Sequence, residues 1–184
     1  MTPEDLADVI ADVRRLRARF ADTAPRAWEP VTAAAELAVQ LGHLALCLLQ
    51  RAGGDTSELT DQARPITSVG DELADVLLAA LSVAALAGKQ PSPIPVRPPG
   101  FRRTELTEFL RLVAAAGQLS EAAMIAGGCR HQPRGDPPSI QAGSSMVVAC
   151  SEGLATEAGL DLGAEFRGMV ASADAFLDSQ AGRR

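Results

Sequence analysis

The sequence predicts an all-α protein, and three observations support that prediction. Of its 184 residues, 47% are hydrophobic but only 3% are aromatic, and Ala and Leu supply much of the apolar content. β-branched residues are sparse, which favours closely packed helices over sheets. Apolar residues also recur every three or four positions along most of the chain, the spacing that keeps one face of a helix apolar.

Six helices are expected, because capping residues and turns divide the chain at intervals. Thr2 precedes Pro3, an arrangement suited to the start of a first helix. Gly159 is placed to end the fifth helix, and Asp161 is placed to cap the sixth. The expected helices span roughly 3–22, 31–51, 68–88, 104–126, 139–157 and 161–176.

A proline-rich stretch divides the chain into two halves. Residues 89–100, KQPSPIPVRPPG, hold five prolines and are expected to form an extended linker. We therefore expect a first helical unit over 1–90, a linker over 91–103 and a second helical unit over 104–184. The two units are expected to pack on each other as one compact domain.

Composition argues against several classes of protein. The formal net charge of -6, with Lys89 as the only lysine, argues against a nucleic-acid-binding protein. We expect no membrane span, because acids interrupt the most apolar run. The N-terminus lacks the basic and apolar regions of a secretory signal, and the three cysteines have no CxxC spacing. A cytoplasmic protein with reduced thiols is therefore expected.

The chain is organised around residues 68–88, SVGDELADVLLAALSVAALAG. Apolar residues lie on nearly all faces of this helix, so it is expected to be buried all round. Glu72 and Asp75 lie three residues apart near its start, so their carboxylates project from the same side. Two interpretations are open: Ser68 caps the helix and the acids are solvated, or the buried acids hold a cation.

The preceding helix carries a second polar stripe. Glu36, Gln40 and His43 recur at helical spacing beside an apolar face. An isolated histidine in such a position is usually structural. Here, however, the next helix carries Glu72 and Asp75, and helical bundles build metal sites from polar pairs on facing helices. The candidate metal ligands are therefore these five residues.

Three other features could contact a substrate. Trp28, the only tryptophan, lies in a turn-rich connection, where it is more often a core residue than a platform for a base. The arginines at 14, 15, 17 and 19 are expected to form a solvated face, with phosphate contact as the alternative. Lys89 is a further candidate for contact with phosphates.

The two halves of the sequence resemble each other. QLGHLALCLL in the first half pairs with AGQLSEAAMI in the second, which places His43 opposite Gln118. ITSVGDELADVLLA pairs likewise with IQAGSSMVVACS, which places Glu72 opposite Ser145. We therefore expect a duplicated helix pair that forms a pseudo-two-fold bundle, with the acids in the first pair only.

The first half resembles the all-α nucleotide pyrophosphatase superfamily, the MazG-like and dCTP-pyrophosphatase-like proteins. The resemblance rests on ELAVQLGHLALCLL and GDELADVLL, and the later segment GLDLGAEFRGMV is also similar. It implies a bundle of two MazG-like helix units, a homodimer, and Mg²⁺-dependent hydrolysis of a nucleoside triphosphate to the monophosphate and pyrophosphate. The family's ExxD pair falls on Glu72 and Asp75, which the resemblance makes catalytic residues as well as metal ligands.

The chain departs from the family at the ExxE pair, which falls on Gln40 and His43. Gln40 offers a neutral oxygen, and His43 offers a nitrogen, which suits Mn²⁺, Zn²⁺ or Ni²⁺ better than Mg²⁺. Two formal negative charges are lost, and Glu36 lies one turn away as the residue that could compensate. Two functions stay open: a divergent nucleotide pyrophosphohydrolase, and an inactive relative that binds a nucleotide, a related phosphorylated small molecule or another protein.

Overall fold

The computed structural model describes residues 1–60, 66, 68–94, 103–132, 134–136 and 139–181. This part of the chain holds six α-helices and no strand, which confirms the predicted all-α class. The helices are α1 (Pro3–Ala21), α2 (Pro30–Arg51), α3 (Val69–Leu86), α4 (Glu105–Ala126), α5 (Ile140–Ala158) and α6 (Leu162–Ala181). The bounds of the first five lie within two residues of the expected ones.

Side-chain caps start most of these helices where the sequence predicted. The Thr2 hydroxyl accepts from the backbone N–H of Asp5, and the Asp5 carboxylate accepts from the Thr2 N–H in return. Asp161 Oδ1 accepts from the Ala164 N–H at 3.0 Å at the start of α6. Gly159 ends α5 in the left-handed region, with a φ of 71°, which a glycine adopts without strain.

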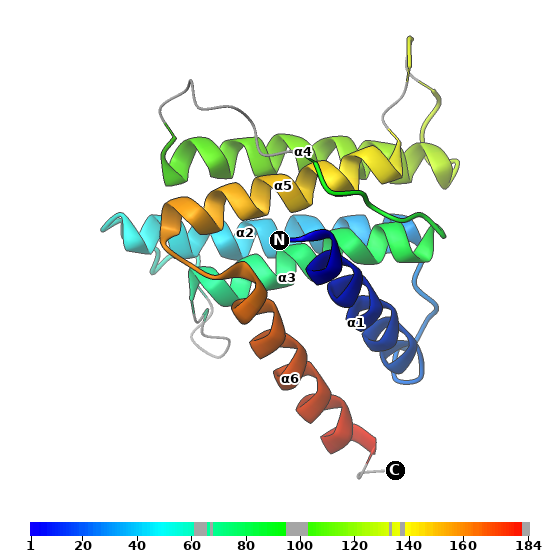
Figure 1. Ribbon diagram of the computed structural model, residues 1–184, viewed down its shortest axis with the longest axis horizontal. Coiled ribbons are helices and arrows are strands. Elements are labelled where there is room, and N and C mark those ends of the chain that lie inside the picture. The colour runs from blue at the N-terminus through cyan, green and yellow to red at the C-terminus, as the bar shows by residue number, and fades with distance from the viewer. Residues whose placement is uncertain (61–65, 67, 95–102, 133, 137–138, 182–184) are drawn as a thin grey trace.

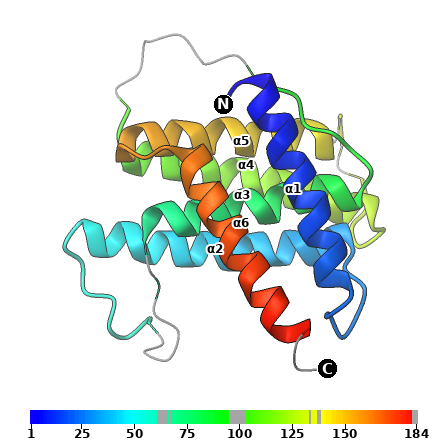
Figure 2. The same cartoon turned by 60° about the horizontal axis from the view of Figure 1, so that its bottom comes forward.

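Four helices form a bundle, and the other two cross one side of it. α2 pairs with α3 and α4 pairs with α5, while α2 also packs on α4 and α3 on α5 (Figure 1). α1 and α6 run diagonally across the bundle, where both pack on α3 (Figure 2). In the described part of the chain, neither α1 nor α6 packs against α2 or α4. Residues 95–102 of the predicted linker lie outside the described residues.

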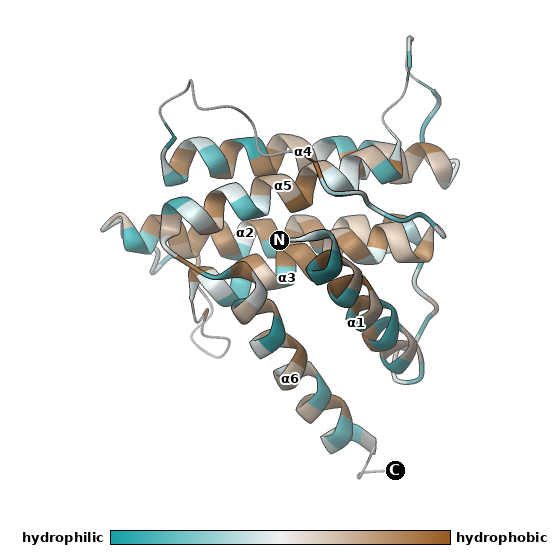
Figure 3. Cartoon of the chain, in the orientation of Figure 1, coloured by the Kyte–Doolittle hydropathy of each residue, from teal (hydrophilic) through white to brown (hydrophobic). Residues whose placement is uncertain are grey.

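α3 lies at the centre of the molecule. Fourteen of its 18 residues are buried, as expected from its apolar sequence, and it packs against each of the other five helices. Figure 3 shows its mostly hydrophobic surface among helices that carry teal, hydrophilic residues on their outer sides. Small residues let neighbouring helices approach closely: a Cβ added at Gly143 of α5 would lie only 3.0 Å from the Leu119 Cα of α4.

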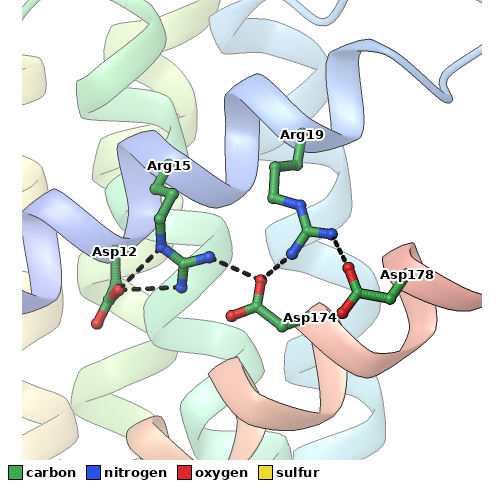
Figure 4. Close-up of polar contacts among 5 residues, drawn as sticks. All are labelled: Asp12, Arg15, Arg19, Asp174 and Asp178. Atoms are coloured by element: carbon green, nitrogen blue, oxygen red, sulfur yellow. Dashed lines mark hydrogen bonds and ion pairs between the residues drawn. The ribbon is translucent and has the colours of Figure 1, made fainter. Parts of the chain in front are cut away.

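Ion pairs join α1 to α6 on the outside of the bundle. Asp174 of α6 accepts from Arg15 Nη1 at 2.7 Å and also from Arg19, which in turn contacts Asp178 (Figure 4). Arg15 is held by Asp12 as well, at 3.1 Å. Both arginines lower the pKa of the Asp174 carboxyl. Two arginines of the α1 cluster therefore serve to tie the two crossing helices together.

Asp174→Asn should lower the melting temperature, because it leaves two arginines without their shared acceptor charge. The loss should be largest at low salt, since the Debye length falls from about 30 Å at 0.01 M to about 3 Å at 1 M salt. Thermal unfolding followed by circular dichroism at both salt concentrations tests this. Asp8→Asn removes an exposed acid of α1 as the control. An equal loss at both salt concentrations would contradict a charge-based role.

Candidate functional site

The candidate site lies between α2 and α3, close to the start of α3. His43 of α2 faces Glu72 of α3, and its Nδ1 atom lies 3.4 Å from the carboxylate Oε2. Ser68 caps α3 by accepting from the Asp71 N–H at 3.1 Å, so this acid lies in the first turn, where the helix dipole favours negative charge. The fold thus brings the histidine together with the first acid of the predicted ExxD pair.

Hydrogen bonds along α2 orient the histidine. Gln40 Nε2 donates to Glu36 Oε1 at 2.8 Å, and Gln40 Oε1 lies 3.2 Å from His43 Nδ1. Because Gln40 donates to Glu36 through its amide nitrogen, it presents its amide oxygen to the histidine. Nδ1 therefore carries a proton in this contact. In the neutral ring, Nε2 is then the atom able to bind a metal or accept a proton.

Glu72 is an acid with only 6% of its surface exposed. Burial raises the pKa of its carboxyl, and the neighbouring His43 acts in the opposite direction. Oε2 has no hydrogen-bond partner among the described residues, because the 3.4 Å contact with His43 is an ion-pair distance without hydrogen-bond geometry. A buried carboxylate oxygen without a donor is destabilising, and a bound cation would relieve it.

Asp75 lies one turn farther along α3 and is half-buried. Burial raises the pKa of its carboxyl to about 7, and the negative charges of Asp71, Glu72 and Glu36 add to the rise. The same acids act on Cys47 of α2, where burial, Glu72 and Asp71 raise the pKa of the thiol to about 11. This face is therefore an acidic region that a cation would stabilise.

The predicted ligands are brought near one another but are not arranged around one point. In the part of the chain that the structure describes, no three His, Cys, Asp or Glu side chains are grouped closely enough to hold a metal ion. Glu36, Gln40, His43 and Glu72 form one line of contacts, and Asp75 is linked to them through its charge. Metal binding would therefore require side-chain rotation toward a shared position.

Arg17 differs from the other arginines of α1 and belongs to this region. Its guanidinium carbon lies 4.6 Å from the Trp28 ring centroid and 4.9 Å from that of Phe20. Burial lowers the pKa of Arg17, and the charge of Glu36 on α2 opposes that effect, so the two groups interact electrostatically. Trp28 is partly buried against the core. In the sequence, Arg17 can be told apart from the other arginines of α1 because it lies four residues after Val13, on the buried face of the helix.

Lys89 is not part of this group. It is exposed and follows the far end of α3, whereas Glu72 and Asp75 lie near the start of that helix. From Asp75 to Leu86, the last residue of α3, the helix alone rises about 16 Å at 1.5 Å per residue, and Lys89 lies beyond that end. The structure therefore gives Lys89 no contact with the candidate site.

The matching face of α4 and α5 holds a different set of charges. A cleft of about 670 Å³ is lined there by Gln118, Arg103 and Arg111. Glu108 is 2% exposed, and both its oxygens accept from Arg111 Nη1 at 3.0 Å. Gly153 makes room for this carboxylate, because a Cβ there would lie 2.5 Å from Glu108 Oε2. Sequence reasoning missed this pair, although its spacing of three residues on one helix could have revealed it.

Comparison of the chain with known protein families, with curated proteins and with solved structures finds no match. The resemblance to the all-α nucleotide pyrophosphatases therefore stays a prediction that rests on the sequence segments quoted above alone.

The pKa of Asp75 predicts how the stability of the fold depends on pH. Its carboxyl is protonated below about 7 in the folded protein but only below about 3.8 in the unfolded chain. Between pH 3.8 and about 7, the folded state binds a proton at Asp75 that the unfolded chain has lost. The free energy of unfolding therefore falls as the pH rises through this interval. Asp75→Asn should raise the melting temperature at pH 8 more than at pH 5, as measured by calorimetry without divalent cations.

Asp136→Asn provides the control, because this exposed acid lies in the connection between α4 and α5. An Asp75→Asn effect of the same size at both pH values would show that its carboxyl does not titrate in this interval.

Proposed function

We propose that the candidate site between α2 and α3 binds a divalent cation together with a nucleoside triphosphate. The protein then hydrolyses this triphosphate to the monophosphate and pyrophosphate. The observation that carries this proposal is the buried Glu72 carboxylate, whose Oε2 has no hydrogen-bond partner among the described residues. Nearby acids add to the negative charge, since Glu36, Asp71 and Glu72 all contribute to the raised pKa of Asp75. A cation would offset this repulsion.

The types of ligand atom present suit a divalent cation such as Mg²⁺ or Mn²⁺, once the side chains rotate toward a shared position. Carboxylate oxygens from Glu72, Asp75 and Glu36 suit either ion, and the Gln40 carbonyl is a further neutral oxygen. The His43 nitrogen favours Mn²⁺. When bound, the cation would neutralise phosphate charge and polarise the phosphoanhydride bond.

The chain's own side chains supply the remaining chemistry. Asp75 lies one turn from Glu72 in the acidic region, where its carboxylate would either help to hold the cation or accept a proton from an attacking water. Arg17 feels the charge of Glu36, and an added phosphate charge would likewise attract its guanidinium. Trp28 holds the Arg17 guanidinium at 4.6 Å, so it would position that arginine.

The same proposal extends to the fold: the bundle consists of two MazG-like helix units, α2–α3 and α4–α5. The pairing of these helices supports it, as does the match of His43 with Gln118 in the two halves. The second unit has Ser145 and Val148 in place of Glu72 and Asp75, so catalysis is assigned to the first unit only.

A second candidate function is a non-catalytic relative that binds a nucleotide or a protein. One observation favours it: among the described residues, no group of three metal-binding side chains is already assembled. Gln40 and His43 are hydrogen-bonded to each other in place of the family's two carboxylates. Nucleotide binding without turnover is the result expected of this candidate.

Pyrophosphate release from a panel of ribo- and deoxyribonucleoside triphosphates, with Mg²⁺ and with Mn²⁺, tests the proposal. Release should require a divalent cation, and Glu72→Ala should reduce it by at least 100-fold, a loss of roughly 2.7 kcal/mol of transition-state stabilisation. Circular dichroism of the variant establishes that the helices are retained.

Ser145→Ala is the matched control, because alignment of the two halves pairs this residue with Glu72. Its turnover should equal that of the natural sequence. Turnover that survives Glu72→Ala would place catalysis elsewhere. Calorimetric titration with a nucleotide then separates the two candidates if no triphosphate is hydrolysed: heat of binding supports the non-catalytic relative.

A further inference from the structure

The cleft between α4 and α5 has the size of a small-molecule site. These two helices lie side by side at the top of Figure 1. The cleft volume of about 670 Å³ falls within the range of ligand pockets, about 300–1,000 Å³. None of the described residues that line it belongs to α2 or α3, so the cleft is separate from the candidate site. We call it the α4–α5 cleft.

A buried acid fixes Arg111 in the wall of this cleft. Glu108 is almost fully buried, and both of its oxygens accept from Arg111 Nη1. Gly153 of α5 leaves the space that the Glu108 carboxylate occupies. Because the guanidinium is already held, a ligand that binds it has less side-chain entropy to overcome.

Arg111 has donors left for a ligand. Its hydrogen bonds with Glu108 use Nη1 alone, so Nε and Nη2 have no hydrogen-bond partner among the described residues. The Arg111 side chain is 38% exposed, which leaves these donors accessible from the cleft. A guanidinium presents its N–H groups as a planar fork that fits the two oxygens of a carboxylate.

A second arginine gives this part of the cleft an excess of positive charge. Arg103 Nε lies 3.8 Å from Glu108 Oε1, so two guanidiniums share one carboxylate. The other acid in the lining, Glu152, contacts the Met1 amino group. One positive charge around Glu108 is therefore left uncompensated, which suits a ligand with one negative charge.

α4 carries the opposite charge to α2 at an equivalent position. The alignment that pairs His43 with Gln118 also pairs Glu36 with Arg111. Glu36 belongs to the acidic region of the candidate site, whereas Arg111 and Gln118 line the α4–α5 cleft. The two helix pairs thus present opposite charges, which favours a cation in the first and an anion in the second.

Much of the remaining lining is apolar and aliphatic. Two alanines of α4 line the cleft together with Met146 and Ala149 of α5 and with Ile94. The segment before Ile94 is held against α5, because the Ser92 N–H donates to Ser145 Oγ at 2.9 Å. No aromatic side chain is among the described lining residues, so the cleft offers no platform for a stacked base.

We infer that the α4–α5 cleft binds a small aliphatic carboxylate. The ligand carboxylate accepts from Nε and Nη2 of Arg111, and its hydrocarbon chain lies along Met146 and Ala149. Its single negative charge matches the one positive charge that Glu108 leaves uncompensated. A phosphate monoester carries more negative charge than this part of the cleft can balance.

Calorimetric titration of the full chain with octanoate tests the inference. Octanoate should bind at a single site per chain. Octylamine and 1-octanol have the same chain without a negative charge, and they should bind roughly tenfold more weakly or less, because Arg111 has no anion to hold. Absence of octanoate binding, or equal binding of all three compounds, would overturn the inference. Tighter binding of octyl phosphate than of octanoate would overturn the assignment to a carboxylate.

Met146→Glu locates the binding site by placing a negative charge in the cleft. Met146 is exposed, so the fold should be retained, which circular dichroism checks. The dissociation constant of octanoate should rise by roughly tenfold or more, because like charges repel. Met146→Gln is the matched neutral control and should bind octanoate more tightly than Met146→Glu. Equal dissociation constants in these two variants would place octanoate elsewhere and overturn the inference.

Arg103→Gln provides a second variant that keeps the buried pair intact, since Glu108 still accepts from Arg111. It should weaken octanoate binding by removing the excess positive charge. Arg130→Gln is its control, because Arg130 pairs with Glu121 and does not line the cleft. An equal effect of the two substitutions would contradict a role for the charge of the cleft.

These measurements are separate from the test of the proposed hydrolysis. Octanoate binding is measured without nucleotide or divalent cation, and Glu72→Ala should leave it unchanged. Met146→Glu should in turn leave pyrophosphate release unchanged, because no residue of the candidate site is among the described residues that line the cleft. Loss of octanoate binding in Glu72→Ala with its helices retained would contradict two independent sites.

Discussion

The burial of α3 is the constraint on which the rest of the structure depends. All five other helices pack on it, so its side chains meet protein in almost every direction. An acid on such a helix loses most of its hydration, which favours its neutral form unless a partner compensates. Glu72 and Asp75 are acids in this position, and the raised pKa of each reflects that burial.

The partners on α2 explain how the bundle tolerates these acids. His43 lies 3.4 Å from Glu72, and Gln40 holds the histidine from the other side. Neither side chain carries a negative charge, so fewer negative charges oppose Glu72 and Asp75 than if carboxylates stood at these two positions. The fold is therefore under less electrostatic repulsion in the absence of a cation than a four-carboxylate site would be. For the same reason, a cation at this position would be held less tightly than at a four-carboxylate site.

The two helix pairs solve the problem of buried charge in different ways. In the first pair, the charge of Glu72 has one partner, a histidine, and one of its oxygens has no hydrogen bond within the described residues. In the second pair, Glu108 is almost fully buried, but Arg111 meets both of its oxygens and Gly153 leaves room for it. The second arrangement is internally satisfied, which leaves the first pair as the place where an added ligand would change the energy most.

The sequence by itself determined the six helices, their starts and the burial of α3, because caps and apolar spacing act within one or two helical turns. It also placed Glu36, Gln40, His43, Glu72 and Asp75 on two helices that face each other. Several contacts depended on residues far apart in the chain, among them Arg15 and Arg19 with Asp174 and Asp178. Only the tertiary structure decided which side of α2 and α4 stays uncovered. Apolar spacing shows that a helix can be buried, but not which neighbours cover it. Here the answer depended on α1 and α6, which pack on α3 and leave that side of α2 and α4 exposed.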